Sequence, residues 1–314
     1  MLTEFTASEA VVFPGMGPSR FADVGKFMVI NPYARRLVAK ADERLGYSLV
    51  DAFRDTEGDY SRHAQVSFLV NCVALAQWAE GELGAKPEVV VGPSFGGKAL
   101  AAHSGALSFS DAVWLTYEFA RCLDEFFATE FADVVTHSFV RMPQDVLTRL
   151  FAEMDELGYW HDVSCHIDHD FHMVSLSRDN LEWFQQKLRR NGGMSLYTMH
   201  PPMHVSTFGP LRKKIQAEVF DRLTFADPTL PVVNDQDGRL LTTGEQVRDM
   251  LLDGIVNTVR WPDAVATLKR LGVAKVHIAG QDSLFGRVAV TNKNFQVVAV
   301  DPKLAVSPRK RTAA

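Results

Sequence analysis

Apolar and polar residues alternate along this chain in a pattern that predicts short buried strands separated by longer helices. The runs Ala10–Phe13 and Val89–Val91 are short, apolar and rich in β-branched residues, which is typical of buried strands. Val66–Trp78 is apolar almost all round and too long for a strand, so it predicts a buried helix. A stripe of apolar residues predicts a further helix over 112–127, and Ser108 is placed to cap its first turn.

The C-terminal third repeats this alternation of strands and helices. The expected helices cover 208–223, 244–255 and 261–271, and the expected strands cover 230–234, 275–278 and 296–300. Such alternation favours a mainly parallel sheet covered by helices on both faces. The sequence therefore predicts an α/β protein with an α/β-hydrolase-like core.

The stretch 132–203 has a different pattern and predicts a small inserted subdomain. Its expected elements are a strand over 134–142, a helix over 143–157, strands over 159–167 and 171–176, a helix over 180–190 and a strand over 194–199. The order β-α-β-β-α-β is typical of a ferredoxin-like unit. We therefore expect a large catalytic subdomain formed by 1–131 and 204–314 and a ferredoxin-like subdomain formed by 132–203.

The candidate chemistry begins where the second apolar run ends, at Gly92-Pro93-Ser94-Phe95-Gly96. A buried strand that runs into Gly-x-Ser-x-Gly and then into a helix is the pattern of a nucleophile elbow. The glycines permit a sharp turn in which a bulky side chain would clash. Backbone N–H groups at the start of the helix would face a developing oxyanion. Ser94 is therefore the candidate nucleophile.

A serine nucleophile needs a base, and ten histidines compete for that role. The histidines within 166–172 resemble metal ligands, but they fall in an expected hairpin, where polar residues are common. His200 and His204 have helical spacing, yet Pro201 and Pro202 forbid a regular helix between them. His204 returns the chain to the large subdomain and so lies near the cleft. From the residues alone it is either the base or an ordinary packed or solvated histidine.

Composition narrows the class of protein. The chain has 314 residues with 33 Lys and Arg against 38 Asp and Glu, a formal net charge of −5, which gives no general signature of nucleic-acid binding. It has no apolar run of bilayer length, and Met1–Phe5 begins no secretory signal. Three cysteines without paired or metal-binding spacing favour a reduced, cytoplasmic protein without a metal site. Ser307–Ala314 is expected to be a polar tail.

Several segments, in order along the chain, carry a resemblance to one family. They are Phe13-Pro14-Gly15-Met16-Gly17, the helix entered at Gln65, Gly92–Gly96, Ser104–Ala112, Met203-His204, Pro231–Asn234 and Asn257–Trp261. Together they resemble the malonyl-CoA:acyl-carrier-protein transacylases and the acyltransferase domains of polyketide synthases.

The resemblance implies a Ser94–His204 dyad that works by a ping-pong mechanism. Ser94 would attack a thioester carbonyl, and His204 would serve first as base and then as acid. The backbone carbonyl near Gly254 would orient the histidine, and the N–H groups of Met16 and Phe95 would form the oxyanion hole. The donor would be an acyl group on CoA or on the phosphopantetheine of a carrier protein, with no resident cofactor. Acyl carrier proteins would be the partners, with no nucleic acid and no membrane.

This sequence departs from the family at positions expected to line the substrate pocket. Family members that bind malonyl groups carry an arginine that grips the carboxylate, and the matching position here is Phe119. The elbow histidine is replaced by Pro93, and the segment before the catalytic histidine contains Pro202 and Met203. The glutamine of the N-terminal loop is Met16. Each change removes polarity, and a carboxylate buried there without a partner would cost several kcal/mol.

We therefore expect the acyl group to lack a free carboxylate. Aminoacyl or dipeptidyl starters of polyketide antibiotic biosynthesis fit this expectation, by analogy with the stand-alone acyltransferases of macrolactam pathways. Three alternatives stay open: a malonyl transferase with a relocated clamp, a hydrolase that clears stalled carriers, and a carrier-binding protein without catalysis. The last is disfavoured because Ser94, Gly96 and His204 are all present.

Acyl carrier proteins are acidic, so a basic patch is expected at the mouth of the cleft. The candidate docking residues are Arg189, Arg190, Arg212, Lys213, Lys214 and Arg287. Basic residues on helix faces are, however, usually only solvated.

Overall fold

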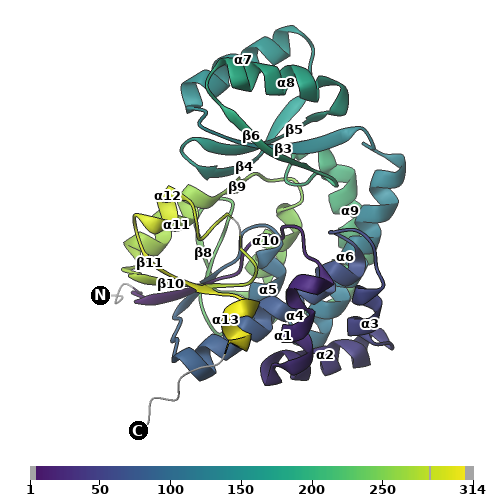
Figure 1. The fold of residues 1–314 in the computed structure, drawn as a ribbon, viewed down its shortest axis with the longest axis vertical. Helices are drawn as coiled ribbons and strands as arrows, with labels where there is room; N and C mark the ends of the chain where they lie inside the picture. The colour runs from purple at the N-terminus through teal and green to yellow at the C-terminus, as the bar shows by residue number, and fades with distance from the viewer. Residues whose placement is uncertain (1–4, 283, 308–314) are drawn as a thin grey trace.

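The structure is a computed structural model that describes residues 5–282 and 284–307. The start of the N-terminal segment and nearly all of the expected polar tail lie outside these residues. Figure 1 shows a large lower part, which contains the first and the last described residues, and a smaller upper part with its own sheet. Among the described helices, none is both long and apolar enough to cross a bilayer.

The large part is built on a six-stranded sheet with the order β11-β10-β1-β2-β7-β8. Five of these strands run parallel, and only the edge strand β8 is antiparallel. The expected α/β core with a mainly parallel sheet is confirmed. The strands are β1 (Glu9–Val12), β2 (Val89–Val91), β7 (Val232–Val233), β8 (Leu240–Leu241), β10 (Lys275–Ala279) and β11 (Gln296–Val300). The strand predicted over 230–234 is therefore only two residues long.

Helices surround this sheet, as expected for a parallel sheet that buries both faces. They are α1 (Phe21–Ile30), α2 (Pro32–Leu45), α3 (Leu49–Arg54), α4 (Arg62–Trp78), α5 (Gly96–His103), α6 (Phe109–Thr129), α9 (Gly209–Glu218), α10 (Gly244–Asp253), α11 (Trp261–Arg270), α12 (Ala289–Asn292) and α13 (Pro302–Val306). The three helices between residues 20 and 54 were not expected from the sequence. The helix predicted over 208–223 is shorter, because α9 is flanked by 3₁₀ turns at Ser206–Phe208 and Phe220–Arg222.

The helix predicted over 66–78 is α4, and it begins four residues earlier than expected. Ser61 caps it, since its hydroxyl accepts a hydrogen bond from the Ala64 N–H at 3.2 Å. Nearly every residue of α4 from Ala64 onwards is buried, which explains why its apolar residues cover all sides instead of one stripe. A π-helical turn over Ala79–Leu83 follows. Ser108 caps α6 in the same way, as predicted.

The small part has the ferredoxin-like order. Its elements are β3 (Val134–Val140), α7 (Gln144–Glu156), β4 (His161–Asp168), β5 (Phe171–Ser177), α8 (Arg178–Arg190) and β6 (Met194–Met199). The strands lie in the order β6-β3-β5-β4 and are antiparallel. Helices α7 and α8 cover the sheet face that points away from the large part (Figure 1). The opposite face is left to form the roof of a cleft.

One strand joins the two parts, and the sequence analysis did not predict it. The short β9 (Val259–Arg260) pairs in parallel with β4, with Cys165 opposite Val259. The Thr258 hydroxyl adds a hydrogen bond of 2.8 Å to the Val163 carbonyl. The small sheet is therefore hydrogen-bonded to the segment that leads into α11, which fixes the roof of the cleft relative to its floor.

Candidate active site

The turn after β2 has the geometry of a nucleophile elbow. Ser94 has φ = 56°, a left-handed conformation that a non-glycine residue seldom adopts. The two flanking glycines are required by space. A Cβ atom on Gly92 would collide with the Gly96 carbonyl, and one on Gly96 would collide with the Phe13 carbonyl. The strand and helix therefore approach so closely that the serine is forced to the tip of the turn.

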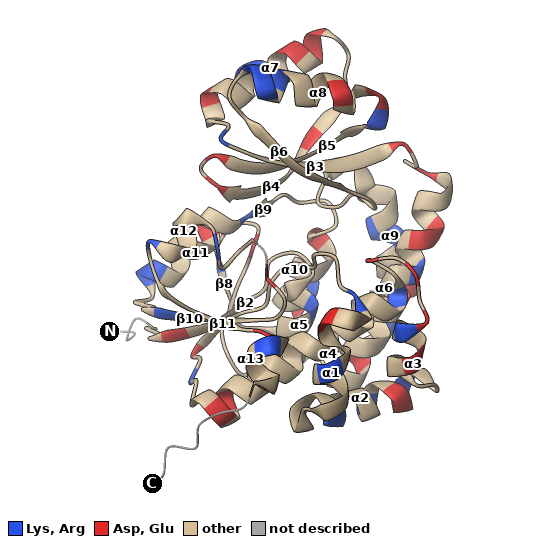
Figure 2. Cartoon of the chain, in the orientation of Figure 1, with Lys and Arg blue, Asp and Glu red and all other residues tan. Residues whose placement is uncertain are grey.

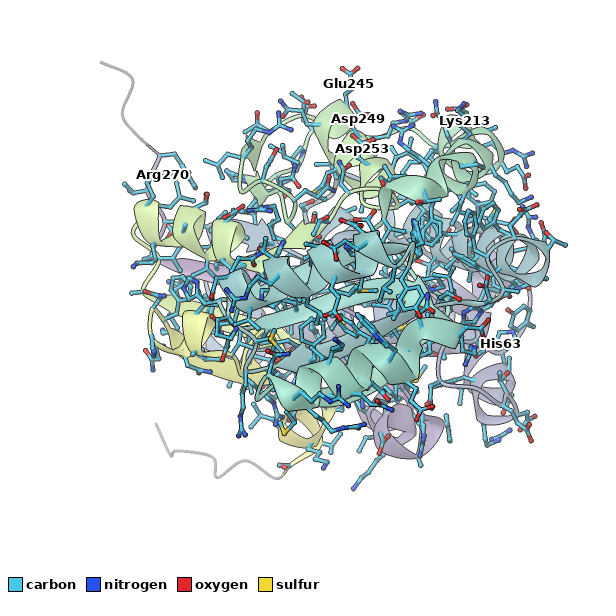
Figure 3. All side chains as sticks on the ribbon, turned by 90° about the horizontal axis from the view of Figure 1, so that it is seen from above. His63, Lys213, Glu245, Asp249, Asp253 and Arg270 are labelled. Atoms are coloured by element: carbon cyan, nitrogen blue, oxygen red, sulfur yellow. The ribbon has the colours of Figure 1, made fainter. Side chains whose placement is uncertain are left out.

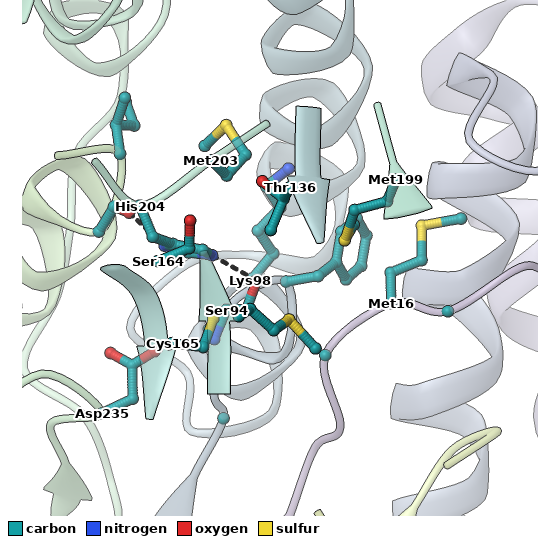
Figure 4. Close-up of a pocket in the computed structure, with 18 of the residues that line it drawn as sticks. Met16, Ser94, Lys98, Thr136, Ser164, Cys165, Met199, Met203, His204 and Asp235 are labelled. Carbon is teal, nitrogen blue, oxygen red and sulfur yellow. Dashed lines mark hydrogen bonds between the residues drawn. The ribbon is translucent and has the colours of Figure 1, made fainter. Parts of the chain in front are cut away.

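The structure brings Ser94 together with His204, 110 residues later in the chain. The Ser94 Oγ lies 2.7 Å from the His204 Nε2 (Figure 4). The His204 Nδ1 lies 2.5 Å from the Gly254 carbonyl oxygen, which can only accept a hydrogen bond. The Nδ1 therefore carries the proton, and the Nε2 is left to accept the proton of the serine hydroxyl. The residues that the resemblance assigned to these roles thus lie in a single chain of hydrogen bonds.

The backbone also holds His204 in place. Its N–H donates to the Ile255 carbonyl at 3.1 Å, and its φ of 66° is again left-handed. The imidazole is almost fully buried, with 8% of the residue exposed. Because burial penalises the charged ring, the pKa of His204 is lowered to about 4, although the hydrogen bond to the Gly254 carbonyl acts in the opposite direction. The imidazole is therefore neutral, and able to act as a base, at neutral pH.

A pH profile tests this assignment. We expect the rate of Ser94 acylation to stay level as the pH falls to about 5 and to drop as His204 is protonated near pH 4. The measurement is single-turnover acylation followed by quenched intact-mass spectrometry. The profile is repeated in Asp235→Asn and in Lys98→Met, because the pocket also holds the Asp235 carboxyl, with a pKa of about 6, and the Lys98 amino group, with a pKa of about 7. An inflection near the ordinary histidine value of about 6.5 that persists in both variants would contradict the lowered pKa.

Asp235 was not identified from the sequence, and it forms a hydrogen bond with the backbone of the elbow. Its carboxylate accepts the backbone N–H of Ser94 at 2.8 Å. Burial raises the pKa of Asp235 to about 6, against the effect of that hydrogen bond. Asp235 follows β7, the strand next to β2, so the contact depends on sheet order rather than on any local pattern.

The two expected oxyanion donors lie in the same pocket as Ser94. Met16 belongs to the loop after β1, and Phe95 follows the serine directly. In the part of the chain that the structure describes, the N–H groups of Met16 and Phe95 donate to no protein acceptor. Both donors are therefore available to an oxyanion that forms beside Ser94.

The pocket, of about 160 Å³, lies between the two parts of the molecule. Its floor comes from the elbow, α5 and α6, and its roof comes from strands of the small sheet. Phe119 and Met203 line it, as expected from the departures in sequence. Pro93 and Pro202 do not line it. Pro93 is buried in the turn, where its carbonyl accepts the Gly96 N–H at 3.0 Å, and Pro201 occupies the wall instead of Pro202.

Lys98 lines the pocket, and it was not among the site residues expected from the sequence. It lies on α5, four residues after Ser94, and is only 7% exposed. Its Nζ lies 3.9 Å from the centre of the Phe119 ring and 4.7 Å from that of Phe95. Burial lowers the pKa of this lysine to about 7. Ser94 lies outside α5, so no helical spacing links the two residues in the sequence, and the folded elbow places both of them at the pocket.

The candidate docking residues do not form one basic patch. Arg189 and Arg190 end α8, on the side of the small sheet away from the cleft (Figure 1). Arg212 is paired with Asp253 at 2.6 Å, and Lys214 is paired with Glu218 at 2.8 Å.

The remaining two candidate docking residues are Lys213 and Arg287. Lys213 is exposed, and Figure 3 shows it on the same rim of the molecule as Glu245, Asp249 and Asp253. Arg287 lines a second cavity, beside Asp282. Basic and acidic residues alternate over the helices throughout (Figure 2). The expected basic rim is therefore not a continuous feature of this surface.

The histidines of 166–172 pack within the small sheet. The Nδ1 atoms of His166 and His172 lie 3.1 Å apart, on the paired strands β4 and β5. Across the described ranges, no group of three or more His, Cys, Asp or Glu residues is arranged to hold a metal ion. Cys72, Cys122 and Cys165 are buried free thiols.

Comparisons with known proteins agree with this geometry. The family model described as "VinK acyltransferase small domain" matches residues 138–199, which is most of the ferredoxin-like part. The malonyl CoA-acyl carrier protein transacylase of Bacillus subtilis (strain 168) is 24% identical over 302 residues, covering 94% of each chain. That of Escherichia coli (strain K12) is 23% identical over 276 residues, covering 86% of this chain and 88% of the relative. Over most of its length the chain is therefore similar to malonyl-CoA:acyl-carrier-protein transacylases.

Solved structures share the same fold. FabD from Acinetobacter baumannii superposes with a TM-score of 0.83 at 19% identity and covers 96% of both chains. A malonyl-transacylase solved in complex with a type II polyketide synthase acyl-carrier protein gives the same TM-score of 0.83 at 19% identity, covering 95% of this chain and 98% of that one. The sequence relatives and these structures are named as transacylases, which are acyltransferase enzymes. The VinK match agrees with the polyketide acyltransferase character expected from the sequence.

Proposed function

We propose that this enzyme moves an acyl group from a thioester donor to the phosphopantetheine thiol of an acyl carrier protein, through an ester on Ser94. The observation that carries the proposal is the hydrogen-bonded chain from Ser94 through His204 to the Gly254 carbonyl, set at the end of a pocket. Relatives named as acyl-carrier-protein transacylases support the choice of acceptor.

Each half-reaction uses the same groups in opposite directions. The Ser94 Oγ attacks the thioester carbonyl, and the His204 Nε2 takes the hydroxyl proton. The C–S bond then breaks, and the departing sulfur takes that proton from His204. In the second half, His204 removes the proton of the incoming thiol, whose sulfur attacks the ester. The C–O bond breaks, and the proton returns to Ser94. No resident cofactor is needed for either half.

We further propose that the acyl group lacks a free carboxylate, as in an aminoacyl or dipeptidyl polyketide starter. Two observations support this. Phe119 lines the pocket at the position where the family resemblance places a carboxylate-binding arginine. The pocket walls near it are apolar, with Leu115, Leu123 and Met203. The nearest arginine along the helix, Arg121, is bound to Glu118, Glu125 and Glu218 instead.

A specific observation favours a second candidate, a malonyl transferase with a relocated clamp. Lys98 brings one amino group into the pocket, directly against the Phe119 ring. An ammonium at that place has the charge needed to hold a carboxylate, though without the two parallel hydrogen bonds of an arginine. The choice between the candidates rests on which donor acylates Ser94.

The test is intact-mass spectrometry of the protein after incubation with a panel of acyl thioesters. The panel contains malonyl, neutral acyl and aminoacyl donors. We expect a mass increase with the neutral or aminoacyl donors. An increase with malonyl alone would support the second candidate. Release of free acid without a lasting adduct would indicate a hydrolase and contradict transfer.

We also propose a cytoplasmic location. The free, buried thiols of Cys72, Cys122 and Cys165 support a reducing compartment.

A further inference from the structure

We propose that the Lys98 amino group binds an oxygen atom of the acyl chain carried on Ser94, and so determines which acyl groups this enzyme accepts. The proposal rests on the acyl-transfer function above and names the chemistry that the pocket recognises. The ligand group is a hydrogen-bond acceptor oxygen, supplied by an amide carbonyl or by a carboxylate.

Lys98 is placed to reach the acyl chain. It lies in the first turn of α5, directly after the elbow that carries Ser94. Both Ser94 and Lys98 line the pocket, and Figure 4 shows the lysine side chain extending from the floor behind Ser94 toward Thr136 on the small sheet. An acyl chain on the Ser94 Oγ would share this space.

Among the residues that the structure describes, none gives the Lys98 amino group an oxygen partner. Its contacts are with the faces of Phe95 and Phe119, and no described carboxylate forms an ion pair with it. Two carboxylates do line the pocket, but backbone groups already occupy them. Asp235 accepts the Ser94 N–H, and Asp282 accepts three N–H groups of the loop 284–286 at 2.8–3.1 Å.

A buried amino group without an acceptor is costly, and aromatic faces compensate for only part of that cost. A ligand oxygen would restore the missing hydrogen bond, whereas an alkyl chain of the same shape would leave it unmade. The lysine is also only about half protonated near neutral pH, since its pKa is lowered to about 7. It is therefore suited to a neutral carbonyl, which a dipeptidyl group carries, as well as to a carboxylate.

The experiment compares donors that match in shape and differ in the terminal group. The probes are N-acetylcysteamine thioesters of malonyl, malonamoyl and 3-methylbutanoyl groups, and the longer succinyl, succinamoyl and 4-methylpentanoyl set. Each set offers a carboxylate, an amide and a branched alkyl end of similar size. The rate of Ser94 acylation is measured by intact mass for the native enzyme and for Lys98→Met. Lys40→Met, which removes an exposed lysine of α2, is the matched control.

We expect the native enzyme to prefer an oxygen-bearing donor over its alkyl match in at least one set. Lys98→Met should lower the rate with that donor by roughly 10- to 100-fold and leave the alkyl donor unchanged or faster. Loss confined to the carboxylate donors would identify a carboxylate as the ligand, and loss confined to the amide donors would identify an amide carbonyl. Lys40→Met should match the native enzyme.

Three results would overturn the proposal: an alkyl preference in both sets for the native enzyme, an oxygen preference that survives in Lys98→Met, or an equal loss with all donors in a folded variant. Thermal unfolding of Lys98→Met is measured in parallel, and removal of a buried amino group from aromatic contacts should not lower the melting temperature. Acylation of Ser94 by any donor still supports the proposed function when the Lys98 dependence fails, so the two failures are distinguishable.

Discussion

Replacement of Ser94 with alanine is expected to abolish the acyl-enzyme and to lower the rate of acyl transfer by about 10⁴-fold or more. The hydroxyl lies 2.7 Å from its base and is the atom that receives the acyl group, so no neighbouring group can take over its role. Alanine keeps the Cβ atom and the left-handed backbone of this position, and we therefore expect the fold to be retained. The measurements are intact mass after incubation with the best donor and the rate of transfer to a carrier protein.

Ser110→Ala is the matched control for this variant. Ser110 lies on α6, is partly exposed and does not line the pocket, so its loss should leave both measurements unchanged. A stable acyl adduct on the Ser94→Ala protein would show that another residue carries the acyl group. That result would remove the basis of the proposed mechanism.

Replacement of His204 with asparagine is expected to slow both half-reactions by roughly 10³-fold or more. Asparagine tolerates the left-handed backbone better than most residues, so this variant changes the chemistry with little added strain at φ = 66°. Its amide cannot take the serine proton, and it cannot return a proton to the leaving thiol. Single-turnover acylation and transfer of a preformed acyl group to the carrier protein measure the two halves separately.

His200→Asn is the matched control, because it changes a histidine in the same segment. The His200 ring contacts the Val134 carbonyl at 3.1 Å and does not line the pocket. We expect it to behave like the native enzyme in both half-reactions. A His204→Asn protein that loses only one half-reaction would contradict the shared acid–base role proposed for this residue.

Much of the fold was predictable because it follows from local patterns. The β-branched run 89–91 and the glycines around Ser94 define the elbow, since no other residue type fits between the strand and the helix. The order of elements over 132–203 predicted the ferredoxin-like sheet, which the structure contains in the order β6-β3-β5-β4. Predictions for short segments were less accurate. Strands β7 and β9 are each two residues long, and β9 was not predicted as a strand.

Local sequence patterns identified only part of the candidate site. Ser94 was identified from its own neighbours in the sequence, whereas the choice of His204 among ten histidines depended on a family resemblance. The structure brings His204 to 2.7 Å from the Ser94 hydroxyl, although the two residues are 110 positions apart. The same holds for the Gly254 carbonyl, which lies 50 positions from His204 and offers only a backbone atom. No side-chain pattern marks such a partner.

The sequence by itself determined the turn that carries Ser94, the α/β class of the core and the inserted small sheet. Each of these follows from short-range sterics or from hydrophobic periodicity within one element. Only the tertiary structure decided what surrounds the nucleophile. It placed Asp235 against the Ser94 N–H and the Lys98 amino group against the Phe119 ring. These contacts depend on the order of strands in the sheet and on which face of a helix meets the cleft, and they are fixed only when distant segments pack together.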